Sequence, residues 1–449
     1  MTLAQQTYVP DDNFEAHLEA NGMGNGIAND DYVTTANINT VTNLFVITQN
    51  IADLTGIEDF TSLISLDCWG NQLTTLDISQ NINLEFLDVG YGYSTSPLGN
   101  YLTSLDVSQN TVLQHLRCGN NQLTSLDVSQ NTALLSLGCE SNQLMSLDVS
   151  QNTALTWFSC WSNQLTSLDV SQNINLVDFQ CSWNNLTNLD VTNNNLLEVL
   201  FVMSNQLTSL DVSQNNSLKW LYCDTNNLAS LDVSNNTALT KLICASNNLT
   251  SLNLNNTNNV NFDTTSTGWW ANIPPNNYSH PGFNTTNNTE LNCIDVDNIS
   301  WANANWTVSN DNIDPTMFFS TDCSIIVFGC TDLFSCNYDS LATVNNGSCI
   351  YFTESYDTIF AINNYDWNGT TLTSSGDYID TLINPVGCDS IVNLNLTITI
   401  PSGILNITNT ENTLLKITDM LGQETPYRRN TPLFYIYDDG TVEKRIVIE

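Results

Sequence analysis

Apolar residues recur through the middle of the chain with a period of 21 residues. The copy that begins at Leu134 fits L-x-x-L-x-C-x-x-N-x-L and then restates the pattern as L-x-x-L-x-V-x-x-N up to Asn152. One copy has a single apolar edge that it cannot bury alone, whereas stacked copies share a continuous core and a parallel sheet along one face. The period therefore predicts a repeat solenoid that is mainly β with little helix, followed by small β modules.

A column of cysteines marks the repeats. Seven cysteines occupy the same interior strand position, with Val202 in their place in one copy: Cys68, Cys118, Cys139, Cys160, Cys181, Cys223 and Cys244. Cys68 precedes Cys118 by 50 residues, which is two periods plus eight residues, and the extra residues lie between Gly90 and Gly99. Nine copies therefore run from Leu63 to Asn259, with one loop inserted in the second copy.

Two polar columns accompany the apolar ones. An asparagine follows each central strand, and we expect its amide to bond the turn backbone of its own and neighbouring copies: Asn121, Asn142, Asn163, Asn184, Asn205, Asn226 and Asn247. The aspartates of the L-D-V segments form a row in which like charges lie about 4.8 Å apart, which is costly: Asp77, Asp106, Asp127, Asp148, Asp169, Asp190, Asp211 and Asp232. Hydrogen bonds to nearby Ser or Asn groups, or bound calcium, would offset this cost.

This pattern resembles the leucine-rich-repeat family, in the short form shared with internalin-type bacterial surface proteins, over residues 40 to 323. The resemblance implies an N-terminal segment with a helical cap over 1–39, the solenoid over 40–260 and a C-terminal cap over 261–323. The cap helix is expected near Asp11 to Leu18. At the other end the resemblance implies a cap stapled by a disulfide between Cys293 and Cys323.

The cysteines divide into two groups. We expect those of the strand column to be free buried thiols, because cysteine behaves there as a small apolar residue and neighbouring strands do not suit a disulfide. A metal site of stacked thiols is the alternative, but no histidine accompanies them. The even number outside the column suits an oxidised, exported protein. Beyond the cap pair, three pairings stay open for Cys330, Cys336, Cys349 and Cys388.

The segment 326–350 is similar to a short cysteine-rich module, G-C-T-D…C-N-Y…G-S-C, that occurs in exported bacterial proteins. Its oxygen-bearing side chains are candidate calcium ligands, namely Asp332, Asn337, Asp339 and Asn345. The alternative is a disulfide-knotted linker. Residues 351–400 alternate apolar and polar positions and are similar to the small β modules of bacterial adhesins.

Residues 401–449 resemble the C-terminal sorting domain of the type IX secretion system. The resemblance rests on the turn Asp419–Gly422, the strand Phe434–Tyr437, the hairpin at Asp439–Thr441 and the final strand Lys444–Ile448. The usual Y-P-N-P opening is missing. The resemblance implies the type IX secretion machinery as a partner and a secreted or bacterial cell-surface location. In this reading the tail is cleaved after export.

Charge excludes one class of partner. The chain has eight basic and 46 acidic residues, for a formal net charge of -38, and five of the basic residues lie in the last 34 positions. A nucleic-acid binder needs basic residues to displace counterions from phosphates, so nucleic acid is excluded as a ligand. No apolar run is long enough for a membrane span. The start lacks a basic and apolar signal segment, and Leu3-Ala4-Gln5 is interpreted as a remnant around a cleavage site.

Aromatic side chains flank the interior Leu and Cys of several strands and so face outward on the expected concave sheet. Such rings suit sugar stacking or protein contacts, and we take as candidate ligand-binding residues Trp69, Phe86, Trp157, Trp161, Phe201, Trp220 and Tyr222, with Tyr91 and Tyr93 on the inserted loop. No catalytic motif occurs, and His17, His115 and His280 are far apart. We therefore expect a non-enzymatic, adhesin-like protein that binds a protein or glycan. The alternative is a structural component of a surface layer or extracellular matrix.

Overall fold

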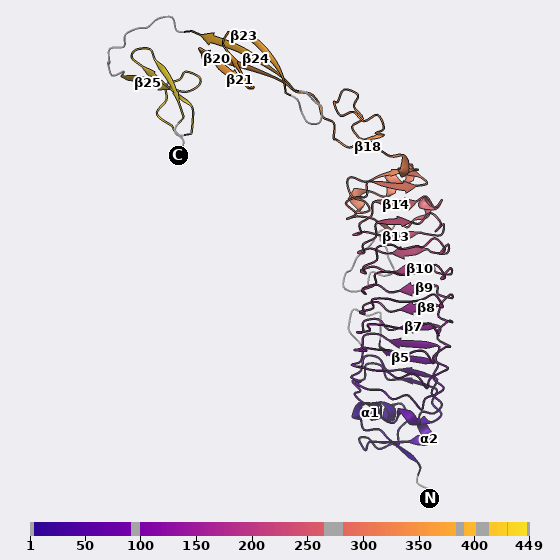
Figure 1. The fold of residues 1–449 in the computed structure, drawn as a ribbon. Coiled ribbons are helices and arrows are strands. Elements are labelled where there is room, and N and C mark those ends of the chain that lie inside the picture. Colours follow the sequence, from indigo (N-terminus) through magenta and orange to yellow (C-terminus); the bar gives the residue numbers. More distant parts are fainter. Residues whose placement is uncertain are drawn as a thin grey trace. The chain divides into compact units, whose positions relative to one another are not determined.

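The computed structural model describes residues 4–90, 99–264, 282–382, 390–400, 413–428 and 430–446. The chain divides into two compact units, residues 1–326 and 327–449 (Figure 1). The first unit holds the repeats, and each unit is described by itself below.

An 11-stranded sheet runs through the first unit, and every pair of neighbouring strands in it is parallel. Each repeat adds one short strand, and the strands stack in chain order as the rungs seen in Figure 1. The predicted mainly β solenoid is therefore confirmed. The strands are β3 (Asn43–Phe45), β4 (Ser65–Asp67), β5 (Phe86–Gly90), β6 (His115–Cys118), β7 (Ser136–Gly138), β8 (Trp157–Ser159), β9 (Asp178–Gln180), β10 (Val199–Phe201), β11 (Trp220–Tyr222), β13 (Lys241–Ile243) and β15 (Phe283–Asn284).

The period of two along each strand separates the core from the surface. The middle residue of β7, Leu137, pairs with Phe158 of β8, and Phe158 pairs with Phe179 of β9; all three side chains are fully buried. The rings of Phe158 and Phe179 stack with their centroids 5.4 Å apart. The seven cysteines of the column are also fully buried and free, which confirms the expectation of apolar thiols.

Asparagine side chains connect each repeat to its neighbours. The amide Nδ2 of Asn142 donates to the carbonyl oxygens of Cys118, 3.0 Å away, and Cys139, 3.1 Å away, while its Oδ1 accepts from the backbone N–H of Leu123 at 2.9 Å. The first asparagine column thus acts as predicted. A second buried column lies on the other side of the core, where Nδ2 of Asn152 donates to the carbonyls of Val128 and Asn131, both at 2.9 Å, while its Oδ1 has no hydrogen-bond partner.

The aspartates of the L-D-V segments form local turns. Oδ1 of Asp127 accepts from the backbone N–H of Ser129 at 2.9 Å, and the other aspartates of this row from Asp77 to Asp232 accept in the same way from the residue two positions on. The hydrogen bond from the backbone N–H of Ser129, followed by the one from its side chain, holds the pKa of Asp127 below its usual range. The hydrogen-bonded interpretation is therefore confirmed, and calcium at this row stays a prediction.

Caps close both ends of the core. At the N-terminal end Asp11 caps α1 (Asp12–Ala20) by accepting from two backbone N–H groups, and α1 buries Phe14 and Leu18. The remaining N-terminal elements are the antiparallel pair β1 (Gln6–Tyr8) and β2 (Tyr32–Thr34), with α2 (Thr35–Ile38) and the 3-10 helix η1 (Ile57–Asp59).

At the C-terminal end a four-stranded parallel sheet continues the L-D-V row. The Cys293–Cys323 disulfide, with the Cα atoms 5.9 Å apart, joins this sheet to the 3-10 helix that begins at Cys323. The strands of the sheet are β12 (Ser230–Asp232), β14 (Ser251–Leu254), β16 (Cys293–Val296) and β17 (Phe318–Ser320). The short helices here are η2 (Asn259–Asn261), α3 (Ile299–Asn305), η3 (Val308–Asn310) and η4 (Cys323–Ile325).

The second unit consists of small sheets. A disulfide joins Cys330 to Cys349, and Cys336 is disulfide-bonded as well. The sheets pair β18 (Phe328–Gly329) with β19 (Val344–Asn345), β20 (Glu354–Ile362) and β23 (Gly376–Leu382) with β24 (Ser390–Thr399), β21 (Tyr365–Trp367) with β22 (Thr370–Leu372), and β25 (Leu414–Thr418) and β27 (Val442–Arg445) with β26 (Leu433–Tyr437).

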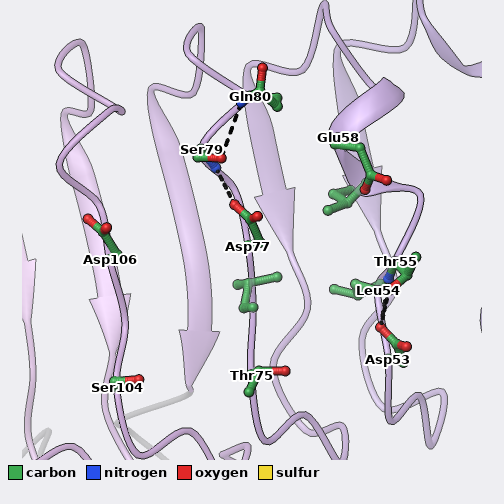
Figure 2. Close-up of a pocket in the computed structure, with 12 residues that line it drawn as sticks. Asp53, Leu54, Thr55, Glu58, Thr75, Asp77, Ser79, Gln80, Ser104 and Asp106 are labelled. Carbon is green, nitrogen blue, oxygen red and sulfur yellow. Dashed lines mark hydrogen bonds between the residues drawn. The ribbon is translucent and has the colours of Figure 1, made fainter.

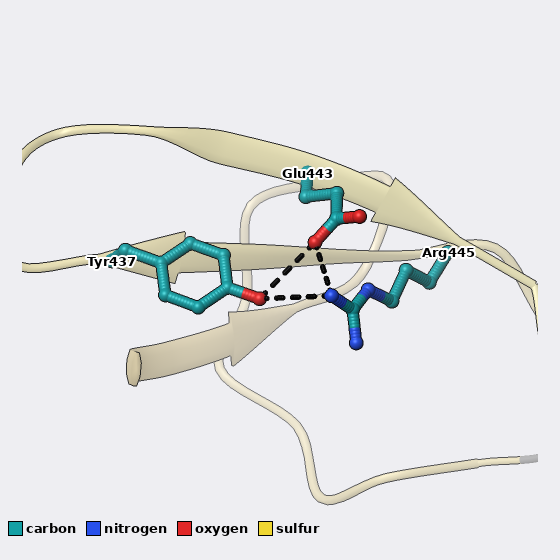
Figure 3. A network of polar contacts seen from close by, with 3 residues as sticks. All are labelled: Tyr437, Glu443 and Arg445. Atoms are coloured by element: carbon teal, nitrogen blue, oxygen red, sulfur yellow. Dashed lines mark hydrogen bonds and ion pairs between the residues drawn. The ribbon is translucent and has the colours of Figure 1, made fainter. Parts of the chain in front are cut away.

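A polar triad lies on the last of these sheets. Figure 3 shows Arg445 reaching both Tyr437 and Glu443: its guanidinium donates to the Tyr437 hydroxyl at 3.2 Å and pairs with the Glu443 carboxylate. The hydroxyl of Tyr437 donates in turn to Glu443 at 3.1 Å. All three side chains lie on β26 or β27, so the triad ties these two strands together.

Candidate functional site

The outward side of the 11-stranded sheet is the surface on which the candidate aromatic residues lie; we call it the sheet face. It consists of the strand residues that flank the buried Leu and Cys, such as Trp157, Ser159 and Trp161 around β8. Six of the predicted binding residues are half-buried there: Trp69, Phe86, Trp157, Trp161, Trp220 and Tyr222.

Phe201 does not present its ring to solvent, contrary to the role predicted for it. Its side chain is 1% exposed, and its ring stacks with that of Tyr222 with the centroids 4.5 Å apart. Phe201 therefore supports Tyr222 and cannot itself offer a stacking surface. Tyr91 and Tyr93 lie outside the described residues.

A row of carboxyl groups on the sheet face is withdrawn from solvent. Asp88 and Glu140 are each 2% exposed, and burial raises the pKa of both carboxyls to about 7. Burial also raises the pKa of Asp67, Asp178 and Asp224 to about 6. These five acids stand out because the L-D-V aspartates are exposed and have lowered pKa values. Asp88 and Glu140 are buried and the other three are half-buried, which the strand pattern alone does not indicate.

Gly138 explains how one of these acids becomes buried. A Cβ at this glycine would lie 3.0 Å from Oε2 of Glu140 and 3.2 Å from Cη2 and Cζ3 of Trp157. The indole of Trp157 and the carboxyl of Glu140 therefore both lie close to the backbone of β7, and a side chain at position 138 would force them to shift. The neighbouring Gly119 gives Glu140 the same close approach on β6.

Two basic side chains on the sheet face are each held by a ring and a carboxylate. The guanidinium of Arg117 lies 5.8 Å from the ring centroid of Phe86 and 3.7 Å from Oδ2 of Asp88. At the other end of the sheet, Nζ of Lys241 lies 4.9 Å from the ring centroid of Trp220 and 3.2 Å from Oδ2 of Asp263. Ring and carboxylate together attract a cation more strongly than either does alone.

Several buried polar atoms of the sheet face have no hydrogen-bond partner within the chain. Buried polar groups are nearly always paired in folded proteins, by protein, water or ligand. Six such atoms lie along strands β4 to β11: Asp67 Oδ1, Arg117 Nε, Glu140 Oε2, Ser159 Oγ, Ser182 Oγ and Asp224 Oδ1. The hydroxyl of Ser159 still lies close enough to Glu140 to act on the pKa of that carboxyl. The sheet face therefore has hydrogen-bonding capacity that the chain itself does not use.

Trp183 extends the aromatic surface beside Trp161. The two rings meet edge to face with their centroids 6.0 Å apart. Trp183 has a φ of 51°, a left-handed conformation that bulky residues rarely adopt. The equivalent position in other repeats carries a small polar residue such as Ser141, Ser162 or Ser204. This strained tryptophan lies where an indole adds to the sheet face, which fits a functional position.

A hollow of about 460 Å³ lies along the L-D-V segments of the first repeats. Figure 2 shows that Asp53, Asp77 and Asp106 line it from successive repeats. Oδ1 of Asp53 accepts from Thr55, and Oδ1 of Asp77 accepts from Ser79. The aspartates thus complete turns within their own repeats. Their carboxyl groups therefore have a structural role, and we do not take this hollow as a ligand site.

The predicted calcium ligands of the second unit are engaged in local bonds. Oδ1 of Asp332 accepts from Phe334 and Oδ2 from the Tyr351 hydroxyl, while Asn337 bonds Ser348 and Ile350. Oδ1 of Asp339 accepts from Leu341, and Oδ1 of Asn345 from Gly347. A calcium site at these four residues stays a prediction.

Asp12, Glu15 and Asp31 form a group of acidic side chains close enough to share a metal ion, and no other such group of acidic, histidine or cysteine side chains occurs among the described residues. Both oxygens of Glu15 already accept from backbone N–H groups, of Asp30 and Asp31. The described residues also include no helix that is long and apolar enough to span a bilayer.

Comparison with known proteins finds a short local match in sequence. No protein-family profile matches the chain. Internalin J of Listeria monocytogenes serotype 4b (strain F2365) is 40% identical over 74 residues, which are 16% of this chain and 8% of internalin J. The matched stretch thus spans less than a tenth of that relative.

Two solved structures are also similar. The functional domain of internalin J from Listeria monocytogenes, described as including a cysteine ladder, is 25% identical with a TM-score of 0.48, and the match covers 99% of both chains. A leucine-rich-repeat protein of Leptospira interrogans is 26% identical with a TM-score of 0.44, over 48% of this chain and 57% of the other. The repeat geometry described above and the local identity to internalin J support an internalin-like leucine-rich-repeat solenoid.

Proposed function

We propose that the chain is a secreted or cell-surface binding protein that holds a protein or glycan ligand on the sheet face. The observation that carries this proposal is the combination of half-buried aromatic rings and unpaired buried polar atoms on one side of a single rigid sheet. Aromatic anchors on a rigid surface provide most of the binding energy in many interfaces. The unpaired atoms supply the polar contacts that would orient the ligand.

The experiment is binding of the purified chain to arrays of glycans and of extracted surface proteins, with calcium and with chelator. We expect a discrete ligand whose binding falls at least about tenfold in Trp157→Ala and Trp220→Ala, because each change removes a ring from the sheet face. Tyr101→Ala is the matched control, since Tyr101 is 52% exposed and lies off the strands. A chain that binds no ligand and instead sediments as a calcium-dependent oligomer would contradict the proposal and favour a structural role.

We further propose that residues 401–449 direct export by the type IX secretion machinery. Support comes from the small antiparallel sheet of β25, β26 and β27 and from the basic residues concentrated there. The test is expression of the full chain and of a chain that ends at residue 400, each preceded by the same signal peptide for transfer across the inner membrane, in a host with that machinery. The full chain should reach the medium or the cell surface, and the shortened chain should stay inside the cell. Equal export of both chains would refute this role.

A further inference from the structure

The sheet face carries more unpaired acceptors than donors. Two of its carboxylates retain a buried oxygen without a partner and lie beside an aromatic ring: Glu140, next to Trp157 and Trp161, and Asp224, next to Tyr222. Glu140 is 2% exposed, so its unpaired Oε2 is deeply buried. Only one cationic donor on the described face, Nε of Arg117, is unpaired.

Two cationic side chains of this chain already contact such a pair of ring and carboxylate. Arg117 lies between Phe86 and Asp88, and Lys241 lies between Trp220 and Asp263. Residues 1 to 415 contain only three basic residues, so the chain has no further cation of its own for Glu140 or Asp224. The third, Lys219, already pairs with Glu198 at 2.7 Å.

We propose that the ligand on the sheet face is a basic protein segment, whose lysine or arginine side chains bind at Glu140 with Trp157 and Trp161, and at Asp224 with Tyr222. This inference rests on the proposed function of the sheet face. Glu140 lies at β7 and Asp224 at β11, four strand spacings apart, so the two cationic groups of the partner lie about 19 Å apart. A net charge of -38 attracts such a partner from a distance.

Recognition needs only side-chain movement. Glu140 turns outward from its position on Gly119 and Gly138, and the incoming ammonium or guanidinium donates to its carboxylate in place of the local contact with Ser159. Rotamer changes of this kind are common at protein interfaces. The hydroxyl of Tyr222 stays protonated, because burial, followed by the charges of Asp224 and Asp263, raises its pKa to about 12. Its ring therefore remains a neutral platform for the cation.

The test measures, at pH 8 where both acids are ionised, the affinity of the full chain for a short peptide of alternating lysine and serine, and for the same peptide with acetylated lysines. The double variant E140Q/D224N should bind the lysine peptide about a hundredfold more weakly, about tenfold for each lost charged hydrogen bond. The double variant D127N/D148N is the matched control: it removes the same charge from exposed positions, and Asn retains the turn-forming Oδ1. Its affinity should change by less than about threefold.

Three results would overturn the inference. Equal weakening in both double variants would mean diffuse charge attraction without a site. Equal binding of the acetylated peptide would mean that no cation is recognised. A neutral glycan that binds, and is lost in Trp157→Ala but not in E140Q/D224N, would retain the proposed function of the sheet face and reject a basic partner. Ligand binding that survives both Trp157→Ala and Trp220→Ala would instead reject the proposed function itself.

Discussion

Replacement of the buried acid Glu140 by glutamine should make the solenoid more stable at alkaline pH. Burial raises the pKa of this carboxyl from its ordinary value of 4.5 to about 7. The native state therefore binds a proton that the unfolded state has released, so stability falls as pH rises between these two values. A tenfold change in proton affinity is worth about 1.4 kcal/mol, and ionised Glu140 thus costs up to about 3 kcal/mol above pH 7.

Glutamine keeps the shape of the side chain and removes the charge. We expect Glu140→Gln to match the parent chain near pH 4 and to exceed its free energy of unfolding by about 1–3 kcal/mol near pH 8. The measurement is urea unfolding at both pH values, followed by tryptophan fluorescence. Asp148→Asn is the control with opposite sign, because the Ser150 N–H holds the pKa of Asp148 below its usual range. A Glu140→Gln variant that is less stable at pH 8 than the parent would refute the reasoning.

Three further changes test the packing. Asn173→Ala should lower the free energy of unfolding, measured in urea, by about 2–4 kcal/mol, because the buried carbonyls of Val149 and Asn152 lose the donor 2.9 Å away. The control Asn175→Ala, at an exposed position, should lower it by less than about 0.5 kcal/mol. Equal effects of the two changes would contradict the role of the column. Gly138→Ala should displace the Trp157 indole, shift its fluorescence and lower the free energy of unfolding by about 1–3 kcal/mol. An unchanged fluorescence spectrum would mean that the ring does not rest on Gly138. The thiols of the cysteine column are fully buried, and burial raises their pKa values. They should therefore resist alkylation by iodoacetamide in the folded chain and react fully in urea, which mass spectrometry would measure. Rapid labelling of the folded chain would contradict their burial.

The fold was predictable because the information that determines it repeats every 21 residues. The periodic Leu and Cys positions define the inside of each strand, and the asparagine after Cys139 has one geometric role that recurs in each copy. A local pattern is sufficient for such features, since each repeat contacts mainly its neighbours. The second buried asparagine column, at Asn131 and Asn152, follows the L-x-V half of the same repeat, so the same local pattern also contains its position.

The candidate site was predictable only in part. Alternation along β8 and β11 indicates which side Trp157 and Tyr222 occupy, but it says nothing of how far each side chain is covered. The burial of Phe201 depends on its stack with Tyr222 from another repeat, and that of Glu140 depends on the absence of side chains at Gly119 and Gly138. These contacts join positions in different copies, and the strand pattern contains no signal for them.

The asparagine columns also determine how the solenoid responds to mechanical tension. Each repeat is held to its neighbour by nearly the same set of hydrogen bonds, as at Asn142 and Asn163, and by the apolar core that they share. A force applied along the stack therefore loads one rung at a time, and the repeats peel away in sequence. Each step releases 21 residues, or about 70 Å of extended chain, so a surface anchored by such a protein would yield gradually under shear instead of breaking at once.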